Sequence, residues 1–109
     1  MKHEKFKAFP SEDEADAFLT SGDINAKSIS YIDTDGLQSL VIGYTESKKT
    51  HHYKIEAEVI DNVLFKGLAN AMKEVEELAE KHGGVICQDM YISQENSLIV
   101  LFLVATEHE

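Results

Sequence analysis

The chain contains no arginine: its ten basic residues are all lysines, and they face twenty acidic residues, for a formal net charge of −10. Arginine is the side chain that most often forms paired hydrogen bonds with phosphates and base edges. Nucleic-acid-binding proteins present a basic patch that neutralises the phosphate backbone. This composition therefore argues against binding to nucleic acids and to anionic membrane surfaces.

Cysteine and proline each occur once, and the apolar runs are short. Cys87 has no partner for an internal disulfide, and its apolar, strand-like neighbours favour a buried and unreactive thiol. No run approaches the ~20 apolar residues that span a bilayer, and residues 1–5 lead into no signal-like stretch. We therefore expect a cytoplasmic protein without membrane association.

The length of 109 residues and the hydrophobic content of 43% suit one folded unit. Domains typically hold ~100–150 residues, and a chain of this size can bury a core. We therefore predict a single domain over residues 1–109.

Hydrophobic periodicity predicts two helices. Residues Ser11–Glu14 form a capping box, in which a serine and a glutamate three residues later bond each other's backbone at a helix start. A short helix follows, with Ala15, Phe18 and Leu19 on its inner side. Asp61 or Asn62 is predicted to cap a long helix, which ends near His82, where two glycines stop it. Its apolar seam is predicted to comprise Leu64, Leu68, Ala71, Met72, Val75, Leu78 and Ala79.

Six strands complete the prediction, at residues 3–9, 26–32, 37–45, 52–60, 85–92 and 98–105. The order strand, helix, strand, strand occurs twice, and Tyr31-Ile32 in the first half matches Tyr91-Ile92 in the second. We therefore predict an internal repeat of residues 1–50 and 51–109. The expected fold is α+β, with two βαββ units forming one antiparallel sheet and both helices on one face. This is a two-layer sandwich in the ferredoxin-like style.

Two features conflict with a simple two-layer fold. Residues 98–104 are continuously apolar, whereas a sheet with one wet face should alternate. We expect a second copy of the chain to cover the other face of this strand, or the sheet to curl over itself. Gly67 lies within the predicted long helix, where glycine costs ~1 kcal/mol relative to alanine. Close packing against a neighbouring element is the favoured explanation, and a gap for a ligand is the other.

No sequence motif carries recognisable chemistry. Residues 33–36 begin like a calcium-binding loop, but Leu37 and Tyr44 occupy positions where such a loop needs oxygen ligands, so a hairpin turn explains them. His51 and His52 point to opposite faces of a strand and cannot easily share a metal ion. We therefore predict no catalytic residues, no cofactor and no metal site.

The favoured hypothesis is a non-enzymatic binding or regulatory protein that acts through protein–protein interaction, as a homodimer. Leu98, Val100 and Phe102 are its candidate interface residues.

Two other functions stay open. The first is an acidic inhibitor that mimics nucleic acid, a device of small phage-encoded proteins directed against host defence. Its candidate residues are Glu56, Glu58, Glu74, Glu76, Glu77 and Glu80. The second is an enzyme or small-ligand binder with a pocket between sheet and helices or at a dimer seam. Its polar lining would come from Tyr31, Tyr44, Tyr91 and the histidines.

Overall fold

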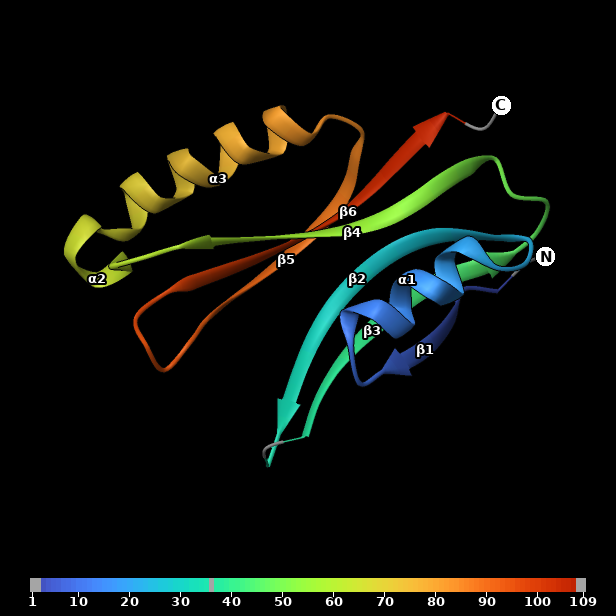
Figure 1. The fold of residues 1–109 in the computed structure, drawn as a ribbon, viewed down its shortest axis with the longest axis horizontal. Coiled ribbons are helices and arrows are strands. Elements are labelled where there is room, and N and C mark those ends of the chain that lie inside the picture. The colour runs from blue at the N-terminus through green and yellow to red at the C-terminus, as the bar shows by residue number, and fades with distance from the viewer. Residues whose placement is uncertain (1–2, 36, 108–109) are drawn as a thin grey trace.

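A computed structural model describes residues 3–35 and 37–107 of the chain. Over these residues the chain forms six strands and three helices, which Figure 1 labels. Their bounds are β1 (Lys5–Phe9), α1 (Glu12–Thr20), β2 (Ile24–Thr34), β3 (Leu37–Glu46), β4 (His51–Ile60), α2 (Val63–Lys66), α3 (Leu68–His82), β5 (Val85–Ile92) and β6 (Leu98–Glu107).

The strands form two antiparallel sheets of three strands each. Sheet A has the order β1-β3-β2, and sheet B has the order β4-β6-β5. The prediction of two βαββ units that share one sheet, with both helices on one face, is therefore wrong. The hydrophobic pattern marks each strand but not which strands pair, because a period of two is the same in one sheet and in two.

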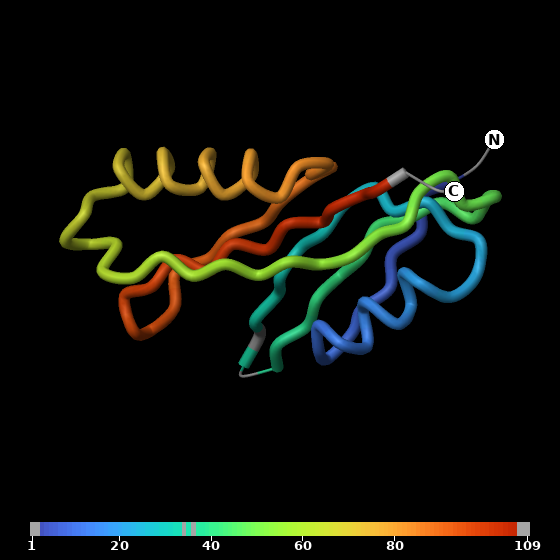
Figure 2. Tube along the Cα trace, turned by 45° about the horizontal axis from the view of Figure 1, so that its top comes forward, coloured from blue at the N-terminus to red at the C-terminus, as the bar shows by residue number. Residues whose placement is uncertain are grey.

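Sheet B lies in the middle of the molecule, with α3 on one side and sheet A with α1 on the other (Figure 2). One hydrophobic core joins sheet A, α1 and the near face of sheet B, and a second core joins α3 and the far face of sheet B. Strand β6 serves both cores: Leu101 and Leu103 lie in the first, and Val100, Phe102 and Val104 lie in the second. Its continuously apolar sequence is thus explained within one chain, without the second copy that the sequence suggested.

The short helix α1 starts as predicted. The Ser11 side chain accepts a hydrogen bond from the Glu14 backbone N–H at 3.3 Å. Ala15 and Leu19 are fully buried beneath it. From the same helix, Asp16 Oδ1 accepts the Ile55 N–H at 2.9 Å, which satisfies a donor on the open side of edge strand β4. In chain order α1 lies between two strands of sheet A, β1 and β2, but it also covers an edge of sheet B.

The long helix predicted after Asp61 is broken in two at Gly67. This residue has a φ of 86°, and a Cβ added there would meet nothing within 4 Å. The expectation that Gly67 permits close packing is therefore wrong: the glycine supplies a left-handed backbone that ends α2 and starts α3. Because of this turn, Leu64 and Leu68 leave the predicted seam and are 81% and 58% exposed.

The cap of α2 also differs from the prediction. Asn62 makes no side-chain cap bond and itself has a φ of 56°. Asn96, in the turn between β5 and β6, takes over: its Oδ1 accepts the Leu64 N–H at 2.9 Å, and its backbone oxygen accepts the Val63 N–H at 3.1 Å. A cap contributed from another part of the chain leaves no local sequence signal.

None of the three helices in the described ranges is long and apolar enough to cross a membrane.

Each half of the chain has the same strand order, first–third–second, and the second strand of each half carries a bulge near its start. Descent of both halves from one duplicated unit stays a prediction.

Candidate binding groove

The two sheets meet at their edge strands β2 and β5. The Tyr31 N–H donates to Asp89 Oδ2 at 2.6 Å. The Tyr31 and Tyr91 rings are stacked, with centroids 4.0 Å apart and planes 9° apart. β2 and β5 belong to separate hydrogen-bonded sheets, so each of these two contacts across the junction involves at least one side chain.

Two adjoining hollows open at this junction and share Tyr31, Gln38 and Tyr91. The hollow towards α1 is small, about 140 Å³, and is completed by Pro10, Ser11, Glu12, Ser39, Leu40 and Leu101. The other, about 420 Å³, is completed by Asp33, Ile92, Ser93, Gln94, Glu95 and Ile99. Together they form what we call the tyrosine groove. The larger hollow is within the range of ~300–1,000 Å³ typical of ligand sites.

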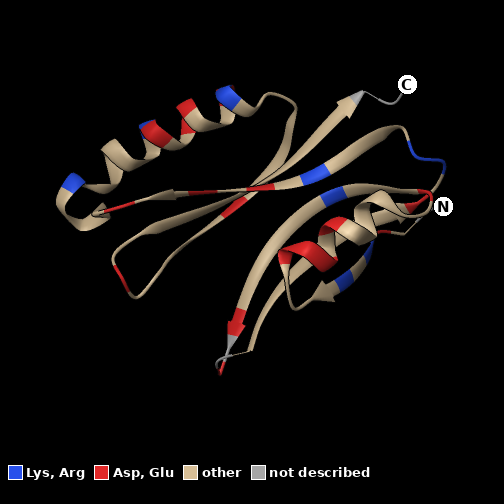
Figure 3. Ribbon diagram, viewed as in Figure 1, with Lys and Arg blue, Asp and Glu red and all other residues tan. Residues whose placement is uncertain are grey.

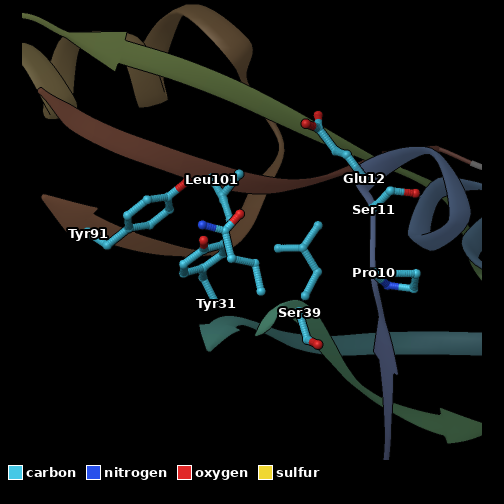
Figure 4. Close-up of a pocket in the computed structure, with 9 residues that line it drawn as sticks. Pro10, Ser11, Glu12, Tyr31, Ser39, Tyr91 and Leu101 are labelled. Carbon is cyan, nitrogen blue, oxygen red and sulfur yellow. The ribbon is translucent and has the colours of Figure 1, made fainter. Parts of the chain in front are cut away.

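Figure 4 shows the end of the groove near α1, where Tyr31 and Tyr91 lie on one side and Ser11 and Glu12 on the other. The described lining residues include three carboxylates, Glu12, Asp33 and Glu95, and no lysine. The groove therefore combines aromatic surface with negative charge.

The carboxylates act on the tyrosine hydroxyls. Burial raises the pKa of Tyr31, and the nearby Asp33 carboxylate raises it further. Burial is also the largest cause that raises the pKa of Tyr91, followed by Tyr31, Glu12 and Asp33. Both hydroxyls therefore stay neutral at physiological pH. They share one hydrogen bond with each other, which leaves one hydroxyl proton for a ligand.

Burial raises the pKa of Glu12 above its ordinary value, and the nearby Asp16 and Asp13 carboxylates add to the effect. Burial likewise raises the pKa of Asp16, while its hydrogen bond from Ile55 opposes the shift. A carboxyl whose pKa is higher in the folded than in the unfolded state binds more protons when folded. Ionising these two groups therefore disfavours the folded state.

We expect their contribution to the free energy of unfolding to grow as the pH falls from about 7 to about 4.5, the ordinary pKa of a glutamate. Below the unfolded-state pKa both states are protonated and this stabilising contribution is fully present. As the pH rises through the higher folded-state pKa, the contribution is lost, so the free energy of unfolding falls. Urea denaturation at both pH values measures it. In Glu12→Gln, which cannot ionise, the gain in midpoint on acidification should be smaller than in the wild type.

Glu76→Gln is the matched control, because Glu76 is exposed on α3 and the charge change is the same. Its response to pH should follow that of the wild type. If Glu12→Gln also follows the wild type, the Glu12 carboxyl is not destabilised by its surroundings.

The six glutamates predicted to form an acidic row lie on β4 and α3 (Figure 3), and lysines interrupt them. Each of three glutamates pairs with a lysine: Lys54 with Glu56 at 3.0 Å, Lys66 with Glu74 at 3.1 Å, and Lys81 with Glu58 at 3.8 Å. The other three, Glu76, Glu77 and Glu80, are exposed on α3.

The predicted apolar interface residues are buried in the second core. Leu98 is 2% exposed, and Val100 and Phe102 are fully buried. Because α3 covers their face of sheet B, a partner could reach them only if that helix moved. They are core residues and not surface residues.

The tyrosines and histidines predicted to line a ligand pocket do not all lie at one site. Tyr31 and Tyr91 line the groove, whereas Tyr44 packs edge-on against Phe18, with ring centroids 4.9 Å apart. His51 stands beside Tyr53. His82 Nε2 lies 3.8 Å from Glu58 Oε2.

His3 and His52 are exposed and do not line the groove, and His108 lies outside the described residues. Cys87 is half-buried, and burial raises the pKa of its thiol.

Sequence reasoning missed the acidic members of the groove. Glu12 was assigned to a capping box, and it does lie in the first turn of α1. Asp33 was assigned to a turn, whereas it is a paired residue of β2. Neither pattern indicates that β2 and β5 bring these carboxylates beside the same tyrosine. The one available signal was the match of Tyr31 with Tyr91, which placed one aromatic residue on the second strand of each half.

Comparison with protein-family models, with curated proteins and with solved structures returned no significant match to this chain.

Proposed function

We propose that the protein is a non-enzymatic binding module of the cytoplasm whose tyrosine groove holds a lysine- or arginine-bearing segment of a partner protein. The observation that supports this function is the stacked pair Tyr31 and Tyr91, flanked by the carboxylates of Glu12 and Asp33. The same observation defines the chemistry of the ligand.

A cationic side chain gains two kinds of stabilisation at such a place. Aromatic faces attract ammonium and guanidinium groups by ~0.5–2 kcal/mol, most strongly where water is displaced. Carboxylates accept charge-assisted hydrogen bonds from the same groups, and arginine can bond one carboxylate twice. The net charge of −10 would also accelerate the approach of a basic partner.

The tyrosine hydroxyls support binding better than catalysis. A general acid or base works best with a pKa near the operating pH, and the groove raises the pKa of both Tyr31 and Tyr91 above their ordinary value. Their hydroxyls suit the positioning of a ligand by hydrogen bonds.

The acidic inhibitor is the weaker of the candidates. A mimic of nucleic acid needs a continuous row of negative charge, and three of the six glutamates predicted for that role are neutralised by Lys54, Lys66 and Lys81.

The proposal is tested with a short peptide in which arginine alternates with glycine, titrated while the backbone amide signals of Tyr31 and Tyr91 are followed by NMR. We expect saturable shifts at both residues and none with a glutamate–glycine peptide. Tyr91→Ala should weaken binding about tenfold, because it removes one aromatic face. A ligand-dependent rise in melting temperature should accompany binding.

The control separates the groove from the overall charge. Glu12→Gln and Glu76→Gln each remove one negative charge, but only Glu12 lines the groove. We expect weaker binding for Glu12→Gln alone. Equal losses for both variants would mean that the peptide senses only net charge, and the proposed site would then be wrong.

A further inference from the structure

The outer face of sheet A, turned away from α1 and sheet B, is open and almost free of charge. The strand register puts Phe6 and Ser28 beside Gly43, and Ala8 and Ser30 beside Val41. Ile32 lies beside Ser39, with Leu37 two residues along β3. Phe6, Ile32 and Leu37 are 65%, 47% and 75% exposed. We call these nine residues the outer face.

Charge distinguishes this face from the rest of the surface. Its nine residues include no ionisable side chain, although 28% of the chain is charged. Glu4 reaches it only at one end, where its carboxylate lies over Gly43 and is 3.4 Å from the Ser28 hydroxyl. By contrast, acidic residues lie along both α1 and α3 (Figure 3).

We propose that this face binds the same face of a second copy of the chain, so that two A sheets pack against each other. Two molecules that each carry a charge of −10 repel, and they can approach most closely where neither presents carboxylates. A basic partner, in contrast, would gain nothing from an uncharged face. The charge distribution therefore favours a copy of the chain over a positively charged partner at this place.

The sizes of the side chains on the outer face suit packing against the outer face of a second copy. Sheets pack face to face at ~10 Å when their side chains interdigitate. Here large side chains (Phe6, Ile32, Val41) alternate with very small ones (Ser30, Gly43). A two-fold axis makes the contact self-complementary, since each patch then meets its own copy.

The size of the face sets the expected strength. On one face of a sheet a residue occupies ~4.8 Å by ~6.8 Å, so these nine residues give a projected area of about 300 Å² per copy. A stable dimer typically buries ~800 Å² per partner. We therefore expect a weak, reversible dimer with a dissociation constant of roughly 10–100 µM.

Sedimentation velocity over a concentration series, from roughly 1 µM to 500 µM around the expected dissociation constant, tests this inference. The wild type should pass from monomer to dimer, at lower concentration as salt screens the net charge. Ile32→Glu places two carboxylates inside the contact and should leave a monomer at every concentration. Circular dichroism checks that this exposed substitution leaves the fold unchanged.

Leu64→Glu is the matched control. Leu64 is 81% exposed on α2, outside sheet A, and the substitution changes hydrophobicity and charge in the same way. It should dimerise like the wild type. A wild-type monomer at the highest concentration would refute the inference, and so would a dimer that Leu64→Glu abolishes and Ile32→Glu preserves. This test is independent of the tyrosine groove.

Discussion

Phe102→Ala is expected to lower the free energy of unfolding by about 3–5 kcal/mol. Phe102 is fully buried on β6, between sheet B and α3, with its ring 5.3 Å from that of His82. Truncation removes buried apolar surface and leaves a cavity that neighbours fill only in part. A domain of this size has a total stability of about 5–15 kcal/mol, so a large part of it would be lost. Urea denaturation followed by circular dichroism measures the change.

Phe65→Ala is the control with the same chemical change. Phe65 on α2 is 93% exposed, so the free energy of unfolding should change by less than about 0.5 kcal/mol. If Phe102→Ala is already unfolded in water, Phe102→Leu gives a measurable loss below about 1.5 kcal/mol. Similar effects of the two alanine variants would contradict the placement of α3 over sheet B.

Gly84→Ala is expected to destabilise the protein by about 2–5 kcal/mol. Gly84 has a φ of 64°, and a Cβ there would overlap the backbone oxygen of Ala105. The left-handed backbone costs an alanine ~1–2 kcal/mol, and forcing β5 away from β6 adds ~1–3 kcal/mol. The overlap also disturbs the hydrogen bond from the Ala105 N–H to the Gly84 oxygen, at 2.9 Å.

Gly83→Ala isolates the contact from the backbone strain. Gly83 also has a φ of 64°, but its Cβ would meet nothing within 4 Å. Only the cost of this backbone conformation (φ 64°, ψ 155°), which is almost restricted to glycine, should remain, at about 1–3 kcal/mol. The difference between the two variants in urea denaturation is thus the cost of the clash. Equal losses would show that β5 does not begin as close to β6 as the structure has it.

Much of the local structure was predictable from the sequence. The cap at Ser11 and the inward positions Ala15 and Leu19 follow from patterns within one helix, and the structure confirms them. Residues 33–36 were predicted to be a hairpin turn. β2 and β3 do form a hairpin there, but Asp33 and Thr34 belong to β2 and pair with Gln38 and Leu37. Such signals are local, because the residues that make the contact are neighbours in the chain.

The division into two sheets was not predictable in the same way. The apolar sequence of β6 correctly showed that both of its faces need cover, but not what covers them. The structure places Leu101 against sheet A and α1, and Phe102 against α3. Gly67 was misread for a similar reason: the cost of a mid-helix glycine signals an exception, and either a close contact or a left-handed turn satisfies it.

The candidate groove was predictable only in its aromatic part. Tyr31 and Tyr91 were named as polar lining residues, and both line it. Glu12 and Asp33 join them because two edge strands meet, and no local pattern encodes that meeting.

The position of β6 in both cores has a consequence for synthesis on the ribosome. β6 is the last of the described strands in chain order, so sheet A and α1 emerge well before Leu101 and Leu103, which complete their core. Until then the nascent chain exposes the apolar side of sheet A to solvent. The first half is therefore not expected to fold stably until β6 has emerged, and folding should be completed largely after translation. In this interval, chaperones that bind exposed apolar strands could bind the apolar side of sheet A.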